Sequence, residues 1–476
     1  MPYHVVVIGG GITGLSAAFA VMAEAQKTSR TLQCTVIEQD SRWGGKILTH
    51  TIGGLLIEGG PDSFLTTKPA ALELCRKLGL EHRLLPTNPL HNKTFAYCRG
   101  ALRELPQGLL TFQPRGIGTL MKSGLLSPLG ILRMAAERFW PSPRNIPEDE
   151  SLSDFFSRRF GHEAFVNLLE PLVAGIYAGD AAELSIQATF PRFRELERVY
   201  GSIFKGMKAS RHPSSNPSSS PTRMFSMFMS LRGGLGELIQ TLVSRLASQK
   251  VILESSLPVR EINIPKSPDD SIDIIFDHGR VLQADAVILS TPAFCSAKLL
   301  RHTCEKLATV LDEIPYASTA TVSFAYKTEQ IRSAVRGFGF VVPRREQRAL
   351  LAATWTSLKW QNRSPPEDTL IRCYLGGRGR ESFLDLDDAQ LGRVITRELK
   401  ELAGIHAEPT VMDVHRWDRG MPQYVLGHRN RLTTIQSLLK TTPGLYLAGA
   451  AFRGIGIPDC IQDGIQTGQT AVQELG

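Results

Sequence analysis

The chain has 476 residues, of which 42% are hydrophobic and 21% are charged. These values are ordinary for a protein with two or three domains and sizeable cores. No apolar run approaches the ~20 residues that a membrane-spanning helix needs, and the short run at residues 5–8 has neither the basic leader nor the cleavage site of an export signal. The formal charge of +8 comes from dispersed basic residues, so we expect no nucleic-acid binding.

The cysteines and histidines favour a protein without disulfides or metals. Seven cysteines are scattered without a Cys-x-x-Cys pair, as is typical of reduced thiols in a cytoplasmic protein. The eleven histidines show no paired ligand spacing, and the acidic run at residues 385–388 lacks the glycine and closing glutamate of a calcium loop. We therefore expect a cytoplasmic location and no metal site.

The first predicted element is a buried strand at residues 4–8. It runs directly into Gly9-Gly10-Gly11-Ile12-Thr13-Gly14 and a helix-like stretch at residues 15–25. In this pattern Gly9 permits a tight turn, Gly11 lets the backbone approach a pyrophosphate, and Gly14 allows close packing of helix on strand. A second strand at residues 34–37 ends in Glu38, whose carboxylate can accept hydrogen bonds from ribose hydroxyls and disfavours a 2′-phosphate. Together they predict a dinucleotide site.

A helical region and a linker follow. Residues 70–208 mix helical periodicity, as at 152–156 and 164–172, with a patch rich in glycine and proline at 116–130. The stretch at 209–223 is rich in serine and proline and cannot bury an apolar face, so we interpret it as a surface loop.

The second half of the chain predicts a helix and then mostly strands. The helix is amphipathic and covers residues 235–246. Strand-like runs follow at 251–253, 272–276, 286–289, 319–326, 337–342 and 370–375. The apolar and polar alternation of the last three predicts an antiparallel sheet with helices between residue 290 and about residue 418.

Two further motifs make the prediction more specific. Ser41-Arg42-Trp43-Gly44-Gly45-Lys46 follows Glu38, and the segment 445–449 near the other end is followed by a glycine-rich turn at 454–461. Arg-x-Gly-Gly after the ribose carboxylate resembles the second signature of the flavin amine oxidase superfamily, which includes amine oxidases, carotenoid desaturases and porphyrinogen oxidases. The resemblance implies FAD rather than NAD, with the C-terminal segment against the flavin ring and ribityl chain.

Four stretches look more narrowly like the coproporphyrinogen III and protoporphyrinogen oxidases of Gram-positive bacteria, at residues 60–65, 170–180, 421–424 and 456–461. This resemblance runs essentially from end to end and implies an α/β fold with three domains. These are a Rossmann-like FAD-binding domain of the flavin amine oxidase type (1–70, 224–298 and 425–476), an α+β substrate-binding domain (71–105 and 299–424) and a mostly helical domain (106–223). Trp43, where a smaller apolar residue is expected, and the Ser/Pro-rich loop depart from the family.

The resemblance also implies the site residues. Beyond the first glycine run and Glu38, cofactor contacts are expected at Arg42, Gly45, Gly60, Pro61, Asp62, Ser63, Val259, Trp417, Gly449, Gly456, Ile457 and Pro458. Substrate contacts are expected at Lys68, facing a propionate, and at Gly175, Ile176 and Tyr177, lining the macrocycle. Three other interpretations stay open: Lys68 as a solvated lysine, residues 175–177 as a helix-ending turn, and Val259 and Trp417 as core residues. No catalytic side chain is predicted, since the flavin carries the chemistry.

The implied activity is the oxygen-dependent, six-electron oxidation of coproporphyrinogen III to coproporphyrin III in haem biosynthesis. Hydride would pass to FAD, with release of hydrogen peroxide. Such a substrate calls for a roomy apolar pocket with a few cationic anchors. Three points stay open: protoporphyrinogen IX as a further substrate, peripheral membrane contact through the helical region, and hand-over to the next haem-pathway enzyme. So do two alternatives: a flavin amine oxidase or carotenoid desaturase, and a non-catalytic binding protein of the same fold.

Overall fold

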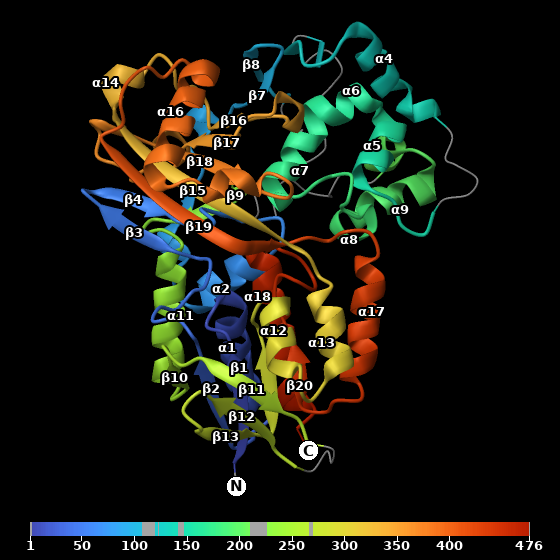
Figure 1. The fold of residues 1–476 in the computed structure, drawn as a ribbon, viewed down its shortest axis with the longest axis vertical. Coiled ribbons are helices and arrows are strands. Elements are labelled where there is room, and N and C mark those ends of the chain that lie inside the picture. Colours follow the sequence, from blue (N-terminus) through green and yellow to red (C-terminus); the bar gives the residue numbers. More distant parts are fainter. Residues whose placement is uncertain are drawn as a thin grey trace, which may run out of the picture.

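The computed structural model describes residues 2–106, 120, 121, 123–140, 147–209, 226–265 and 270–475. Figure 1 shows three regions: a lower α/β lobe that holds both termini, a sheet-rich region at the upper left, and a helical region at the upper right. The Ser/Pro-rich stretch beyond Ala209 and part of the glycine- and proline-rich patch lie outside the described residues. Among the described helices, none is both long and apolar enough to cross a membrane.

The lower lobe is built on a five-stranded parallel sheet. Its strand order is β10 (Ile252–Glu254), β2 (Leu32–Ile37), β1 (Tyr3–Ile8), β14 (Ala286–Leu289) and β20 (Leu445–Leu447). Both faces are covered, which explains the unbroken apolar run of β1. Val5 and Val7 pack into one core, whereas Val6 and Ile8 pack into another on the opposite face.

Different elements pack on the two faces of this sheet. On one side lie α1 (Ile12–Lys27), α11 (Gly236–Ser248), α18 (Ile457–Gln473) and α2 (Ala70–Lys77). The other side holds an antiparallel sheet of β11 (Val259–Asn263), β12 (Ile272–Phe276) and β13 (Val281–Ala284), with α12 (Ala293–Leu300), α13 (Glu305–Asp312) and α17 (His428–Leu439). A small sheet of β5 (Phe64–Leu65), β9 (Phe228–Leu231) and β6 (Leu84–Pro86) completes the lobe.

The upper sheet has seven strands. Their order is β19 (Val411–Pro422), β15 (Tyr316–Lys327), β18 (Asp368–Gly376), β17 (Leu350–Trp355), β16 (Gly339–Val341), β7 (Thr94–Cys98) and β8 (Ala101–Glu104). Helix α16 (Asp388–Ala403) packs into the core of one face. The hairpin of β3 (Thr49–Ile52) and β4 (Leu55–Glu58) packs against β15, β18 and β19 through a small apolar cluster.

The predicted strands at 319–326 and 370–375 are confirmed within β15 and β18, and the strand predicted at 337–342 is confirmed in part, as the shorter β16. Their pairing is antiparallel between β15 and β18, as predicted. The parallel pairing of β16 with β7, which comes from an earlier part of the chain, was not predicted. Local alternation identifies a strand, but it carries no information about a distant partner.

The helical region contains the predicted helices at 152–156 and 164–172. Its elements are α4 (Pro128–Ala135), η4 (Ala136–Phe139), α5 (Leu152–Phe160), α6 (His162–Ala164), the π-helical turn η5 (Phe165–Leu169), α7 (Glu170–Tyr177), α8 (Ile186–Thr189), α9 (Pro191–Tyr200) and α10 (Ile203–Ala209). Helix α7 faces the seven-stranded sheet in Figure 1 and ends above the lower lobe. It therefore lies between the helical region and the rest of the molecule.

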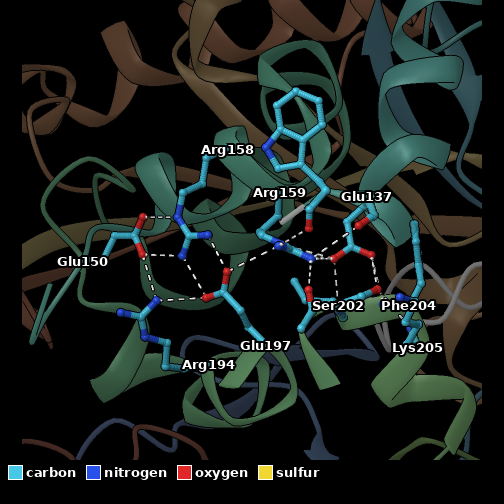
Figure 2. A network of polar contacts seen from close by, with 12 residues as sticks. Glu137, Glu150, Arg158, Arg159, Arg194, Glu197, Ser202, Phe204 and Lys205 are labelled. Atoms are coloured by element: carbon cyan, nitrogen blue, oxygen red, sulfur yellow. Dashed lines mark hydrogen bonds and ion pairs between the residues drawn. The ribbon is translucent and has the colours of Figure 1, made fainter. Parts of the chain in front are cut away.

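A buried network of charged side chains holds these helices together (Figure 2). Arg158 of α5 binds Glu150 and Glu197, with its Nε 2.6 Å from Glu150 Oε1 and its Nη2 2.8 Å from Glu197 Oε2. The next residue, Arg159, has no exposed side-chain surface, and its Nε donates to Glu137 Oε1 at 3.0 Å. Buried charges persist only when they are paired, so this network constrains how α5, η4 and α9 pack.

Candidate flavin site

The turn between β1 and α1 uses glycine for two different reasons. Gly9 has φ +111°, and a Cβ on Gly14 would lie 2.0 Å from the carbonyl oxygen of Gly9, so both are required by the close packing of strand and helix. Gly11 has an ordinary φ of −73°, and a Cβ there would meet no atom within 4 Å. The free side of Gly11 therefore faces open space at the start of α1. Ile12 and Thr13 begin that helix and are buried.

Glu38 is held facing this turn from the end of β2. Its Oε2 accepts from the Gly10 amide at 2.6 Å and its Oε1 accepts from the Asp40 amide at 2.9 Å. The ring of Trp43 lies over Gly10, where an added Cβ would come within 2.5 Å of it. The unexpected tryptophan thus covers the outer edge of the glycine turn. Val259 begins β11, close to the point where the Leu257 amide donates to the Glu38 carbonyl at 3.0 Å.

The Arg-x-Gly-Gly signature packs against the glycine turn between β1 and α1. The Gly44 amide donates to the Gly10 carbonyl at 2.8 Å, and a Cβ on Gly45 would lie 3.3 Å from Gly11 Cα. Arg42 turns back on its own loop, where its guanidinium donates to the carbonyls of Gly45 and Ile47. The same guanidinium lies 6.0 Å from the ring centroid of Trp417.

Trp417 and the Gly59-Gly60 pair join the lower lobe to the seven-stranded sheet. The indole Nε1 of Trp417 donates to the Gly59 carbonyl at 2.8 Å, and Arg372 donates to the Gly60 carbonyl. A Cβ on Gly60 would lie 1.7 Å from the Lys46 carbonyl oxygen, so glycine is required there. Pro61, the next residue, is partly exposed.

The carboxylate of Asp62 is bound by side chains from other parts of the chain. Its Oδ2 accepts from Lys359 Nζ at 2.9 Å and from Trp360 Nε1 at 3.0 Å, and its Oδ1 accepts from Ser63 Oγ at 2.7 Å. Burial would raise the pKa of this carboxyl, but the charges of Lys359 and Arg372 and the bond from Trp360 outweigh it and hold the pKa below its usual range. The carboxylate of Asp62 and the hydroxyl of Ser63 therefore anchor the segment, and a cofactor contact here would involve the backbone.

The C-terminal segment brings a second helix N-terminus to the same place. Gly456 caps α18 without a side-chain acceptor, and the first intrahelical bond is the one from the Cys460 amide to the Gly456 carbonyl, so the amides of Ile457 and Asp459 can meet a ligand. Gly449, with φ +133°, donates its amide to Asp463 Oδ2 at 2.7 Å. Gly464 and Gly468 of α18 let it pack directly on the backbone of α1. Helix α18 consequently runs alongside the beginning of α1, with Gly464 against Thr13 and Gly468 against Ala17.

Two residues of this site were not predicted. Ser290, which follows β14, donates its hydroxyl to the carbonyl oxygens of Ile8 and Gly9 at 3.0 and 2.9 Å. Lys46 directly follows Gly45, and burial lowers its pKa, partly offset by the neighbouring thiols of Cys460 and Cys295. A lysine directly after Arg-x-Gly-Gly was a signal available in the sequence, whereas nothing local indicated Ser290.

The predicted substrate residues lie beside the start of α18. Lys68 Nζ is 2.7 Å from both carboxylate oxygens of Asp459, and about half of its side-chain surface is exposed. At the end of α7, Ile176 is 45% exposed and a Cβ on Gly175 would meet no atom within 4 Å. Tyr177 is buried against Phe190 and Tyr424. Only Gly175 and Ile176 of this segment therefore offer open surface.

Gln423 and Tyr424 connect α7 to the C-terminal segment. Gln423 Nε2 donates to the Tyr177 carbonyl at 2.9 Å. The Tyr424 hydroxyl donates to the Ala450 carbonyl at 2.7 Å and accepts from the Gly454 amide at 2.8 Å. This pair explains what the Met-Pro-Gln-Tyr motif does structurally.

His428 gives the first prediction. Its ring is buried and stacked on Tyr424, with ring centroids 4.2 Å apart, and burial followed by the nearby charge of Arg431 lowers its pKa to about 4. An unfolded histidine has a pKa of about 6.5. Between these values the unfolded chain binds a proton that the folded chain does not, so stability decreases as the pH falls from about 6.5 towards 4.

We expect the urea midpoint of unfolding to fall over this pH range, and to fall less steeply in a His428→Phe variant. An exposed-site control, His278→Phe, should keep the slope of the parent protein; an unchanged slope in His428→Phe would contradict the assignment.

Taken together, a parallel sheet, a glycine turn facing a carboxylate and a second helix start from the C-terminal end define a dinucleotide-dependent flavoprotein. The open side of Gly11 at the uncapped start of α1 fits a pyrophosphate, and Glu38 fits a ribose. The model for flavin containing amine oxidoreductases matches residues 12–475, and the chain belongs to this family. FAD is accordingly its cofactor, and the predicted fold class is confirmed.

Individual relatives show a similarity that is more specific than the family. The chain is 36% identical to the coproporphyrinogen III oxidase of Bacillus subtilis (strain 168) over 462 residues, which is 97% of this chain and 96% of the relative. It is 31% identical to the coproporphyrinogen III oxidase of Staphylococcus aureus, with full coverage of both chains. A crystal structure from Exiguobacterium sp. 255-15, provisionally assigned as a protoporphyrinogen oxidase, matches with a TM-score of 0.85 and 30% identity over 100% of this chain and 99% of that chain.

Proposed function

We propose that this chain oxidises coproporphyrinogen III to coproporphyrin III in haem biosynthesis, as an FAD-dependent oxidase with O2 as acceptor. The observation that carries the proposal is the end-to-end similarity to two coproporphyrinogen III oxidases. Two placements support it: Lys68 lies beside the start of α18, and Gly175 and Ile176 offer open surface at the end of α7. The three-domain division inferred from the sequence, a cytoplasmic location, and hand-over of the product to the next haem-pathway enzyme form part of the same proposal.

The chemistry divides between cofactor and protein. When bound, FAD supplies a two-electron hydride acceptor, and three rounds with three O2 remove the six electrons and give three H2O2. The protein positions the macrocycle: Gly175 permits close approach, Ile176 gives an apolar surface, and Gln423 fixes the end of α7. Lys68 offers a cation to a propionate once its bond to Asp459 opens.

Lys68 provides the test of this placement. In Lys68→Ala, loss of a charge-assisted hydrogen bond should raise KM for coproporphyrinogen roughly 10-fold, with kcat and FAD content nearly unchanged. Lys68→Arg should restore most of the affinity, and Asp459→Asn, which removes the competing carboxylate, should lower KM. Porphyrin fluorescence under steady-state conditions measures all three, with Lys77→Ala on α2 as a matched control. An unchanged KM in Lys68→Ala would remove the residue from the substrate site.

The same assay separates the competing activities. No O2-dependent fluorescence beyond autoxidation in the parent protein would overturn the proposed function and favour an amine oxidase or a carotenoid desaturase. A purified protein that takes up no FAD would favour the non-catalytic alternative. Coproporphyrinogen carries four propionates and protoporphyrinogen two, so the ratio of kcat/KM for the two substrates decides between them.

We also propose peripheral membrane contact through the helical region. Exposed apolar side chains occur at Met121 before α4, at Leu129 and Leu132 of α4, at Phe139 of η4, and at Trp140 directly after it. Clustered exposed apolar residues are typical of interaction surfaces, including those of interfacial helices.

Vesicle binding tests this contact. We expect the parent protein to co-sediment with vesicles that contain anionic lipid, and a Leu132→Ser/Phe139→Ser variant to lose most of that binding, because the two side chains are 66% and 81% exposed. Oxidase activity in solution should stay the same. A Val281→Ser variant, altered at an exposed apolar residue of the lower lobe, is the control. Equal sedimentation of all three proteins would contradict the proposal.

A further inference from the structure

A cluster of two histidines and one aspartate lies outside the flavin site. His50 belongs to β3, and Asp413 and His415 belong to β19. The Nε2 atoms of His50 and His415 lie 3.2 and 2.9 Å from the same atom, Asp413 Oδ2. One ring nitrogen or carboxylate oxygen from each residue lies within 4.8 Å of the other two. Three donor atoms from two distant segments thus converge on one point.

His50 keeps one ring nitrogen without a partner. Both histidines direct Nε2 at the same carboxylate oxygen, at 2.9 Å for His415 and 3.2 Å for His50. His50 Nδ1 is buried without a partner among the described residues. The two rings meet edge to face, with centroids 5.0 Å apart. An ion bound between these atoms would account for the convergence.

The donor set indicates the kind of ion. Two imidazoles and a carboxylate suit Zn²⁺ and other divalent transition metals, whereas Ca²⁺ and Mg²⁺ prefer oxygen ligands. An ion about 2.1 Å from each donor requires donor atoms about 3.0 to 3.4 Å apart, and two of the observed separations are 2.9 and 3.2 Å. The side chains of His50, Asp413 and His415 are 28%, 16% and 23% exposed, which leaves a path for the ion and room for water ligands.

The cluster also joins two parts of the fold. His50 lies on the hairpin that leads to Gly59 and Gly60, while His415 lies two residues before Trp417 on β19. The ring of His415 packs against Gly59, where an added Cβ would come within 2.9 Å of it. An ion at this position would fasten the hairpin to the strand that carries Trp417.

We propose that His50, Asp413 and His415 bind a divalent transition-metal ion, best matched by Zn²⁺, which clamps the β3–β4 hairpin onto β19. The ion is structural, because its ligands belong to the hairpin and to β19 and none of them is a predicted substrate or cofactor residue. The proposal therefore stands independently of the porphyrinogen substrate. It departs from the expectation of no metal, which rested on spacing within short motifs.

Metal content is the direct test. The FAD-loaded full-length protein is stripped with a chelator, dialysed against Zn²⁺ in about tenfold molar excess, and analysed for bound zinc and by titration calorimetry. We expect about one equivalent per chain, with affinity reduced at least 10-fold in His50→Ala, His415→Ala and Asp413→Asn. His278→Ala, which removes an exposed histidine of the lower lobe, should bind as the parent protein does.

Thermal unfolding gives a second readout that does not depend on activity. Zinc should raise the Tm of the parent protein and of His278→Ala, and leave that of His50→Ala unchanged. Each variant must first show the parent's flavin absorbance and metal-free Tm; where alanine disturbs the fold, His50→Gln and His415→Gln replace it. A parent protein that binds no zinc under these conditions overturns the proposal, as do cluster variants that bind it as tightly as the parent.

Discussion

Replacing Gly11 by alanine is expected to give a folded protein that has lost most of its FAD. The backbone of Gly11 has φ −73° and accepts alanine without strain, and the new Cβ would touch no protein atom within 4 Å. It would instead enter the space where the turn admits a pyrophosphate. We expect the FAD dissociation constant to rise at least 10-fold, or about 1.4 kcal/mol, measured by flavin absorbance after gel filtration and by titration of the apoprotein.

Gly14→Ala, in the same turn, is the variant to compare with Gly11→Ala. A Cβ on Gly14 would lie 2.0 Å from the Gly9 carbonyl oxygen and 2.4 Å from Ser290 Oγ. The first of these is backbone and cannot move aside, so Gly14→Ala should lose the fold of the lower lobe together with FAD. Circular dichroism and solubility distinguish the two variants. A Gly11→Ala protein with the parent's FAD affinity would show that the pyrophosphate binds elsewhere.

The second large effect is expected for Glu137→Ala in the helical region. Glu137 has no exposed side-chain surface and binds Arg159, which is equally buried. It also accepts from Ser202 Oγ at 2.7 Å and from the Ile203 amide at 2.8 Å at the start of α10 (Figure 2). Its removal takes the nearer carboxylate from the buried guanidinium of Arg159, which keeps only a 3.5 Å contact with Glu197 and bonds to backbone carbonyls. Breaking a buried ion pair in this way costs about 3 kcal/mol.

The measurement is urea unfolding followed by far-UV circular dichroism. Glu137→Gln keeps the shape and part of the hydrogen bonding, so an intermediate loss is expected. Glu195→Ala, at an exposed glutamate on α9, should change stability by no more than about 0.5 kcal/mol. If Glu137→Ala unfolds at the same urea concentration as Glu195→Ala, the network contributes nothing to the packing of this region.

The glycine turn and Glu38 could be predicted because their signal is local. A strand, a glycine run, a helix and a carboxylate follow one another within forty residues, and each position has a steric or hydrogen-bonding reason. The helices of the middle region and three of the seven strands of the upper sheet carry their own periodicity in the same way.

The unpredicted contacts all join distant parts of the chain. Ser290 reaches Gly9 across 281 positions, Lys359 reaches Asp62 across 297, and Lys68 reaches Asp459 across 391. Such pairs arise from the parallel order of the lower sheet and from the hairpin packing on β19, and no spacing rule encodes them. Asp62, which the family resemblance predicts to contact the cofactor, has its carboxylate bound by Lys359 and Trp360, and these partners appear only in the folded chain.

The strand order of the lower sheet also affects how the protein is made. Helix α1 ends at Lys27, yet its main packing partner, α18, begins at Ile457. At about 5 to 20 residues per second, roughly 20 to 90 s separate the synthesis of the two helices. The apolar face of α1 lacks this cover for that time, so the nucleotide fold cannot close before α18 has been made. Nascent chains of this protein should depend on chaperones in proportion to that delay.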